Sequence, residues 1–170
     1  MSFLELAKSR YSVRRFADKP IEKEKLDAVL EAAQIAPTGH NYQPQKIYII
    51  RSEEALAKLQ TVTKCTYGAK TVLLVAYDEE QEWKNNLEPT STGVVDASIV
   101  ATHIMLEAHE QGLGTCWVAW FAPNKTAEIL DLPKNIKPVL LMPIGYPAEN
   151  SKPSPMHDQN KELSEFVIEL

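Results

Sequence analysis

The segment RYSVRRF, residues 10–16, contains three arginines within six positions. Arg10, Ser12 and Arg14 alternate along it, and in extended backbone alternate side chains point to the same face. Two guanidinium groups and a hydroxyl on one face suit a phosphate, because arginine pairs with phosphate oxygens two at a time. A solvated basic turn between two helices explains the same residues equally well.

The segment PTGHNYQP, residues 37–44, lies between a helical pattern and a strand-like run. Gly39 permits close approach of a ligand to the backbone, while Asn41 and Gln43 offer hydrogen-bond donors and acceptors. Such groups suit the edge of a flat heterocycle that carries both N–H and C=O. An ordinary helix-to-strand turn is the alternative, and the segment alone favours it because Pro, Gly and Asn are common in turns.

The segment GLGTCWVAWF, residues 112–121, begins with Gly-x-Gly. It lacks the third glycine of the dinucleotide-binding fingerprint and follows a helical pattern rather than a strand, so it does not predict a Rossmann phosphate loop. Its aromatic residues are more typical of a core strand than of a cofactor wall.

The sequence offers no Ser-His-Asp set, no carboxylate pair and no cluster with metal-ligand spacing, so we predict no metal site. His103 and His109 are six residues apart in one helical pattern and cannot form an i, i+4 ligand pair. His40 falls in a candidate loop, where a contact to the loop or a ring is favoured over a catalytic proton donor.

The elements that must position these residues follow from hydrophobic periodicity. Helices are expected after Ser2 and over residues 21–33, 53–64, 94–111 and 123–130. Strands are expected over residues 46–51, 71–77, 115–121 and 138–144. The run 71–77 is apolar enough to be covered on both faces, residues 94–111 suit a central helix that ends at Gly112, and Pro143 suggests an edge strand or a bend. This alternation predicts an α/β or α+β class.

Composition sets the remaining limits. The 170 residues suit one domain, and 44% hydrophobic with 24% charged residues is ordinary for a globular protein. A net charge of −5 speaks against nucleic-acid binding. No run approaches the ~20 apolar residues of a membrane span, no signal peptide is visible, and two cysteines suit reduced thiols, so we expect a cytoplasmic protein.

The last part of the chain, residues 147–170, differs in character. It is polar, contains Pro147, Pro153 and Pro155, and ends in the segment 162–170. It is poor in core residues and too long to remain unattached. We predict that this tail packs on a partner subunit.

In this order, the segments resemble the nitroreductase-like flavoprotein family over residues 2–167. The resemblance rests on R-x-S-x-R-x-F at 10–16, A-P-T-G-x-N-x-Q-P at 36–44, G-L-G-T-C-W at 112–117 and G-Y-P at 145–147. It implies an α+β fold with α/β/α-like layers and a central, mostly antiparallel sheet. It also implies a single domain over residues 1–170 and an intertwined homodimer with FMN at the interface.

The resemblance also assigns roles to residues. Arg10 and Ser12 would hold the FMN phosphate and ribityl end, Arg14 would approach the N1–C2=O edge, and Lys161 in the tail would return a cation to the phosphate. The remaining cofactor-binding positions are Tyr11, Pro37, Thr38, Gly39, His40, Asn41, Gln43, Trp117, Val118 and Ala119. Asn160 stands where family members often have a second cation, and Ala119-Trp120 stands where small residues are common.

The implied activity is an FMN-dependent oxidoreductase that takes electrons from NAD(P)H in a ping-pong cycle. Its acceptors would be small and planar, such as nitroaromatics, quinones or flavins. Other flavin chemistry of the family, reductive dehalogenation or oxygen-dependent flavin breakdown, is an alternative. A non-enzymatic FMN-binding redox sensor is another, and Trp120 is the residue that would block its pocket.

Overall fold

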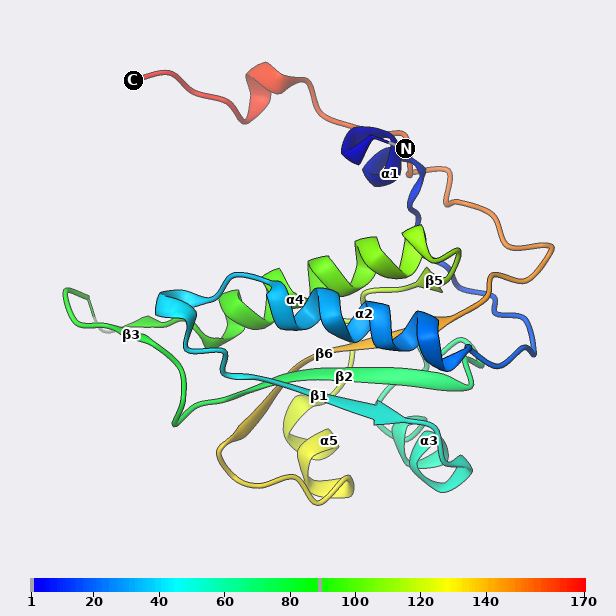
Figure 1. The fold of residues 1–170 in the computed structure, drawn as a ribbon, viewed down its shortest axis with the longest axis horizontal. Coiled ribbons are helices and arrows are strands. Elements are labelled where there is room, and N and C mark those ends of the chain that lie inside the picture. Colours follow the sequence, from blue (N-terminus) through cyan, green and yellow to red (C-terminus); the bar gives the residue numbers. More distant parts are fainter. Residues whose placement is uncertain (1, 89) are drawn as a thin grey trace.

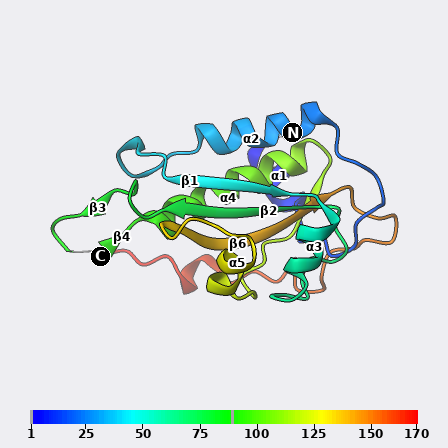
Figure 2. The same cartoon turned by 90° about the horizontal axis from the view of Figure 1, so that it is seen from below.

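The computed structural model describes residues 2–88 and 90–170. A four-stranded sheet lies between two layers of helices (Figure 1). One face is covered by α2 (Lys23–Ile35) and α4 (Gly93–Glu110), and the other by α3 (Glu53–Leu59) and α5 (Pro123–Ile129) (Figures 1 and 2). The first helix, α1 (Phe3–Ser9), begins with a capping box between Ser2 and Glu5 and contacts α4.

The sheet has the order β1-β2-β6-β5, and each neighbouring pair is antiparallel. Its strands are β1 (Gln45–Ile50), β2 (Thr71–Asp78), β6 (Ile136–Gly145) and β5 (Gly114–Thr115). A separate two-stranded hairpin consists of β3 (Lys84–Asn85) and β4 (Thr90–Ser91). The predicted α+β class with a mostly antiparallel sheet flanked by helices is confirmed.

The core lies on both faces of strand β2. Leu73 and Val75 pack toward α2 and α4, while Val72 and Leu74 pack toward the α3 side, and all four side chains are fully buried. This alternation follows from the two-residue period of a strand. The expectation that residues 71–77 are covered on both faces is therefore confirmed.

Helix α4 is the central helix that the sequence predicts. Ala97, Val100, Ala101 and Ile104 are fully buried, and the chain turns out of the helix at Gly112, whose φ is +75°. A positive φ favours glycine, which explains why the helix ends there. In the part of the chain that the structure describes, no helix combines the length and apolar character needed to cross a membrane.

The edge position expected for Pro143 is wrong, because β6 lies between β2 and β5. The Pro143 carbonyl accepts a hydrogen bond from the Cys116 N–H at 3.2 Å. In a strand the N–H and C=O of one residue point to the same side. The N–H that proline lacks would therefore face the chain just beyond Thr115, where β5 has already ended, so a proline is tolerated.

Two predicted elements are shorter in the structure. The strand expected over residues 115–121 is wrong beyond Thr115. After β5 the chain contacts β6 through the bond from the Cys116 N–H to the Pro143 carbonyl and through an isolated bridge between Val118 and Leu141. The helix expected over residues 53–64 ends at Leu59 and continues as turns. For residues 116–121, apolar composition indicated burial, while the limited pairing with β6 decided the secondary structure.

The tail runs from the end of β6 back past α1, and its last residues lie away from the sheet (Figure 1). It contains one short 3-10 helix, η2 (Leu163–Glu165). All residues from 158 to 170 are exposed. The packing of residues 147–170 on a partner subunit stays a prediction.

Candidate functional site

The basic segment at residues 10–16 runs in extended form along the edge of the sheet. Ser12 pairs with Thr115 in a parallel bridge, and the Val13 N–H donates to the Thr115 carbonyl at 2.8 Å. Val13 is buried, whereas Ser12 and Arg14 on either side of it are not. A Cβ added at Gly114 would lie 2.4 Å from Val13 Cγ2, so the glycine is what lets the segment dock.

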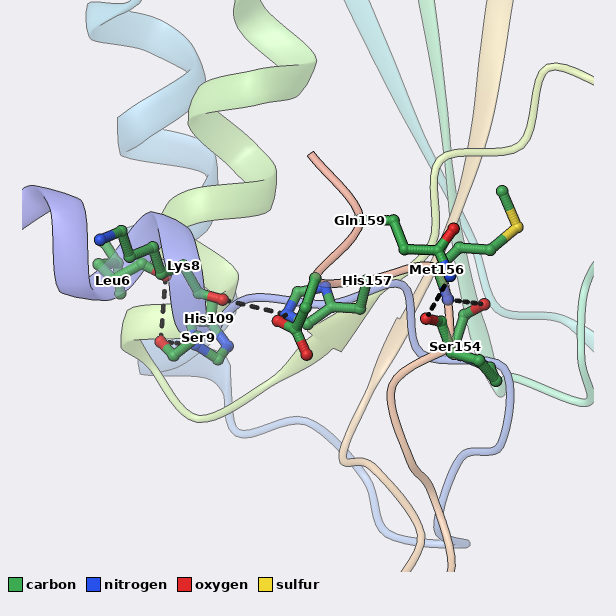
Figure 3. A network of polar contacts seen from close by, with 10 residues as sticks. Leu6, Lys8, Ser9, His109, Ser154, Met156, His157 and Gln159 are labelled. Atoms are coloured by element: carbon green, nitrogen blue, oxygen red, sulfur yellow. Dashed lines mark hydrogen bonds and ion pairs between the residues drawn. The ribbon is translucent and has the colours of Figure 1, made fainter. Parts of the chain in front are cut away.

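Arg10 lies at a small pocket beside the C-terminal end of α4. The pocket has a volume of about 110 Å³ and is lined by Arg10, Tyr11, His109, Pro147 and residues 112–115 among others. His109 Nε2 lies 2.8 Å from the Ser9 hydroxyl (Figure 3). Burial, followed by the positive charge of Arg10, lowers the pKa of His109. The histidine is thus neutral near pH 7, and Arg10 supplies the positive charge of the pocket.

Arg14 lies at a different pocket, of about 330 Å³. The pocket is lined by Arg14, Arg15, Asn150, Ser151, Lys152 and Ser154. Arg14 also donates from Nη1 to the Ser12 carbonyl at 3.3 Å. The alternation within the segment is present, but within one chain the guanidinium groups of Arg10 and Arg14 line separate pockets.

A tyrosine and a thiol that the sequence did not single out as site residues lie beside Ser12 and Arg14. Burial raises the pKa of Cys116, and the charge of Arg14 and the hydroxyl of Ser12 act in the opposite direction. Burial, together with Cys65 and Cys116, raises the pKa of Tyr67 to about 12. Both groups therefore stay protonated near neutral pH and offer hydrogen-bond donors next to Arg14.

The loop at residues 37–43 has an unusual backbone. It contains the 3-10 turn η1 (Gly39–Asn41), and His40, Asn41 and Gln43 have φ values of 49°, 57° and 51°. Non-glycine residues rarely adopt this left-handed region, and clusters of them mark ligand clamps and other functional sites. The sequence predicted the loop as a candidate site, but not this conformation.

Three contacts fix the loop against the rest of the chain. The Gly39 N–H donates to Asp96 Oδ1 of α4 at 2.9 Å. The His40 ring stacks on Trp83, with centroids 5.0 Å apart, and Gln43 Nε2 donates to the Gln34 carbonyl at 3.4 Å. His40 thus contacts the Trp83 ring, and its role toward a ligand stays a prediction.

The segment 117–122 passes from the core to the surface. Val118 is buried and exchanges two backbone hydrogen bonds with Leu141, while Ala119 is exposed. Trp120 is 78% exposed, so it does not face the core. It lines a pocket of about 480 Å³ together with Phe121, Ala122 and residues 60–64.

Within one chain, the basic segment and the 37–43 loop lie at opposite ends of α4 (Figure 1). Arg10 is beside His109 and Gly39 is bonded to Asp96. Thirteen residues separate these two helix positions, which corresponds to about 20 Å at ~1.5 Å per residue. A single chain therefore does not bring the two predicted halves of the site together.

The tail is attached to α1 before it becomes exposed. The Nε2 of His157 lies 3.1 Å from the Lys8 carbonyl, and the Tyr11 hydroxyl donates to Ser151 at 3.3 Å (Figure 3 shows the first contact). Lys161 follows this attachment and is exposed. Its predicted contact with a phosphate stays a prediction.

Comparison with known proteins adds a family and a set of relatives. The model of the Nitroreductase family matches residues 7–67 and 63–146. An FMN reductase [NAD(P)H] of Bacillus subtilis is 30% identical, over 85% of this chain and 65% of that enzyme. A nitroreductase family protein of Clostridium difficile 630 has a crystal structure with 38% identity and a TM-score of 0.92, covering 99% of this chain and 98% of the other. An FMN-dependent nitroreductase of Clostridium difficile R20291 is 27% identical, with a TM-score of 0.80 and 98% of both chains covered.

Proposed function

The chain belongs to the nitroreductase family, and from this we propose that it is an FMN-dependent oxidoreductase that uses NAD(P)H to reduce small planar acceptors. The names of the Bacillus subtilis and Clostridium difficile relatives, which include FMN and NAD(P)H, support the cofactor and the electron donor. The observation that carries the proposal is that one chain contains both a basic segment hydrogen-bonded to the sheet edge and an amide-rich loop with left-handed backbone.

The groups present fit FMN. A dianionic phosphate needs cations and hydroxyl groups, which Arg10 and Ser12 offer at one end of the sheet. A flavin ring edge needs donors and acceptors, which the side chains of Asn41 and Gln43 offer. Gly39 is packed tightly, because an added Cβ would lie 3.2 Å from Trp83 Cβ. The chemistry of these donor sets therefore matches both ends of the cofactor.

FMN, when bound, supplies the two-electron chemistry that connects NAD(P)H to the acceptor. The residues of the chain then have to bind, orient and polarise. We assign the phosphate to Arg10, Ser12 and Lys161. Arg14, next to the protonated Tyr67 and Cys116, is assigned to the N1–C2=O edge, where its charge would stabilise negative charge.

The acceptor is assigned to the pocket at Trp120. Its wall combines the exposed indole of Trp120 with Phe121 and Val62, and the pocket volume of about 480 Å³ is in the usual range of small-molecule sites. A flat apolar wall favours planar molecules such as nitroaromatics and quinones. The neighbouring residues Trp117, Val118 and Ala119 are the ones assigned to the flavin.

We propose that the complete site forms between two copies of the chain. Within one chain, the basic segment and the 37–43 loop lie about 20 Å apart along α4. In the dimer, the basic segment of one chain would face the 37–43 loop of its partner. Apolar side chains are exposed near the loop and in the tail, as expected for surfaces that a second copy covers. They are Ile35, Tyr42, Val94 and Val95 near the loop, and Leu163, Phe166, Val167 and Ile168 in the tail.

Initial-rate kinetics tests the proposed function. NADPH or NADH oxidation is followed with menadione or nitrofurazone as acceptor, each at several fixed concentrations. A ping-pong cycle, in which the nucleotide leaves before the acceptor binds, predicts parallel lines in double-reciprocal plots. Intersecting lines would contradict the ping-pong cycle, in which nucleotide and acceptor occupy the same site in turn. No oxidation of either nucleotide with either acceptor would contradict the proposed reductase activity.

A further inference from the structure

The left-handed residues of the 37–43 loop need an external support. His40, Asn41 and Gln43 all have φ near 50°, and side chains persist in this region only where the surrounding structure holds them. Some bonds stay within the loop or lead to α2: the Gln43 N–H donates to Thr38 Oγ1 at 3.0 Å, and Gln43 Nε2 donates to the Gln34 carbonyl. These bonds close the turn but do not fix it to the central helix.

Asp96 makes the connection to α4. Its Oδ1 accepts the Gly39 N–H at 2.9 Å, and its Oδ2 lies 3.2 Å from the Thr92 hydroxyl. The residue is only 2% exposed although it is an acid. It lies in the first turn of α4, where the helix dipole favours negative charge. A buried carboxylate with one oxygen on a loop amide is suited to orienting that loop.

The neighbours of Asp96 make its position rigid. The Thr92 hydroxyl also lies 2.6 Å from the Trp83 carbonyl, to which it donates, and His40 stacks on the Trp83 ring. Gly39 is closely packed, because an added Cβ would lie 3.2 Å from Trp83 Cβ and 3.5 Å from Thr92 Oγ1. One acid therefore links α4, the loop and the segment around Trp83 through directional contacts.

We propose that Asp96 is a positioning residue that holds the Gly39–Gln43 loop in its flavin-binding shape before the cofactor arrives. This rests on the proposed function for the identity of the ligand. Asp96 acts from behind the loop, through the Gly39 amide. Pre-organising a loop raises affinity because less conformational entropy is lost on binding.

Three substitutions separate the hydrogen bond from the charge and the volume. Asp96→Asn keeps an oxygen for the Gly39 N–H, and its amide group can donate to the Thr92 hydroxyl. Asp96→Ala removes the acceptor, and Asp96→Val removes it while filling the space. Thr102→Ala, an exposed position on the same helix whose hydroxyl donates only within α4, is the matched control.

The measurements are FMN affinity, by quenching of FMN fluorescence on the apo-protein, and amide hydrogen exchange of residues 38–43 without FMN. Asp96→Ala and Asp96→Val should weaken FMN binding at least ~10-fold, as expected for loss of a hydrogen bond to a charged group, and should speed exchange in the loop. Asp96→Asn and Thr102→Ala should stay within about threefold of the parent protein in affinity, with slow exchange in the loop.

Wild-type affinity and exchange in either Asp96→Ala or Asp96→Val would overturn the proposal. Equal weakening in Asp96→Asn would overturn it too, because that variant keeps the bond. If Asp96→Ala does not fold, Asp96→Val decides. If the parent protein binds no FMN, the proposed function fails, while loop exchange in the apo-variants still shows whether Asp96 holds the loop.

Discussion

Arg10 is the residue whose replacement should affect cofactor binding most directly. Arg10→Ala removes the cation of the pocket beside His109, and losing hydrogen bonds to a charged partner costs about 1.5–3 kcal/mol. We expect the FMN dissociation constant to rise at least ~10-fold. Titration of the apo-protein with FMN measures this, with Arg51→Ala, an exposed arginine after β1, as the control. Full FMN retention in purified Arg10→Ala would refute the phosphate assignment.

Sequence reasoning proposed residues for ligand contact, but it missed the residues behind them. Arg10, Ser12, Gly39 and Asn41 were predicted from local spacing. Asp96 was not, because its partner Gly39 is 57 positions away along the chain. The available signal was an acid within the apolar start of α4, since a buried carboxylate in such a helix requires a polar partner. Trp83 and Tyr67 carry no comparable local signal.

At the scale of elements, Glu22 and Tyr146 join the start of α2 to the end of β6. The Tyr146 hydroxyl donates to Glu22 Oε2 at 2.5 Å, and Lys19 lies over the Tyr146 ring. The tyrosine bond, with smaller contributions that include Lys19, lowers the pKa of Glu22 from 4.5 to about 2. A depressed carboxyl pKa stabilises the fold above the unfolded-state pKa, and this contribution is lost as pH falls through the folded-state value.

Tyr146→Phe should therefore lower the melting temperature at pH 6–7 and have little effect near pH 2. The difference between the variant and the parent protein should shrink between about pH 4.5 and 2, because Glu22 takes up its proton near pH 4.5 in the unfolded chain and only near pH 2 in the folded parent protein. Thermal unfolding followed by circular dichroism across this range measures it. A difference that does not change with pH would mean that the tyrosine acts through packing alone.

Gly114 lets the basic segment dock against β5. Gly114→Ala would place a Cβ 2.4 Å from Val13 Cγ2, so Val13 must move, and overpacking of this kind costs about 1–3 kcal/mol. Displacement of Val13 also moves Ser12 and Arg14, so FMN binding should weaken. Chemical denaturation and FMN titration measure the two effects.

Gly68→Ala is the comparison for Gly114→Ala. The φ of Gly68 is +71°, but a Cβ there meets no atom within 4 Å. Only backbone strain of about 1–2 kcal/mol is expected. If both variants lost the same stability and Gly114→Ala bound FMN normally, the contact between Gly114 and Val13 would not position the segment.

Most elements were predictable because their hydrophobic periods are clear. The expected strand at 71–77 and helix at 94–111 match β2 and α4 closely. The expected strand at 115–121 did not form beyond Thr115, because a run of apolar residues does not specify which N–H groups have partners. The interior place of Pro143 follows from the same fact: β5 is too short to require the missing donor.

At the scale of the molecule, the tail is the feature that a single chain leaves unexplained. Its apolar residues Leu163, Phe166, Val167 and Ile168 are all exposed. We expect deletion of residues 162–170 to convert a dimer, of twice the 19.1 kDa chain mass, into a monomer and to lower FMN content. Light scattering coupled to size exclusion measures the mass. Glu169→Gln, which keeps the tail, is the control, and a truncated protein that remains dimeric with full FMN would contradict this role.

The absorption spectrum of the purified protein, before and after adding NADPH or NADH without oxygen, tests the central claim most directly. We predict the yellow bands of an oxidised flavin, which bleach when the nucleotide is added. Flavin that stays oxidised with both nucleotides would contradict the NAD(P)H-linked reductase, and absence of flavin even after FMN is supplied would contradict the cofactor site built from Arg10, Ser12 and the 37–43 loop.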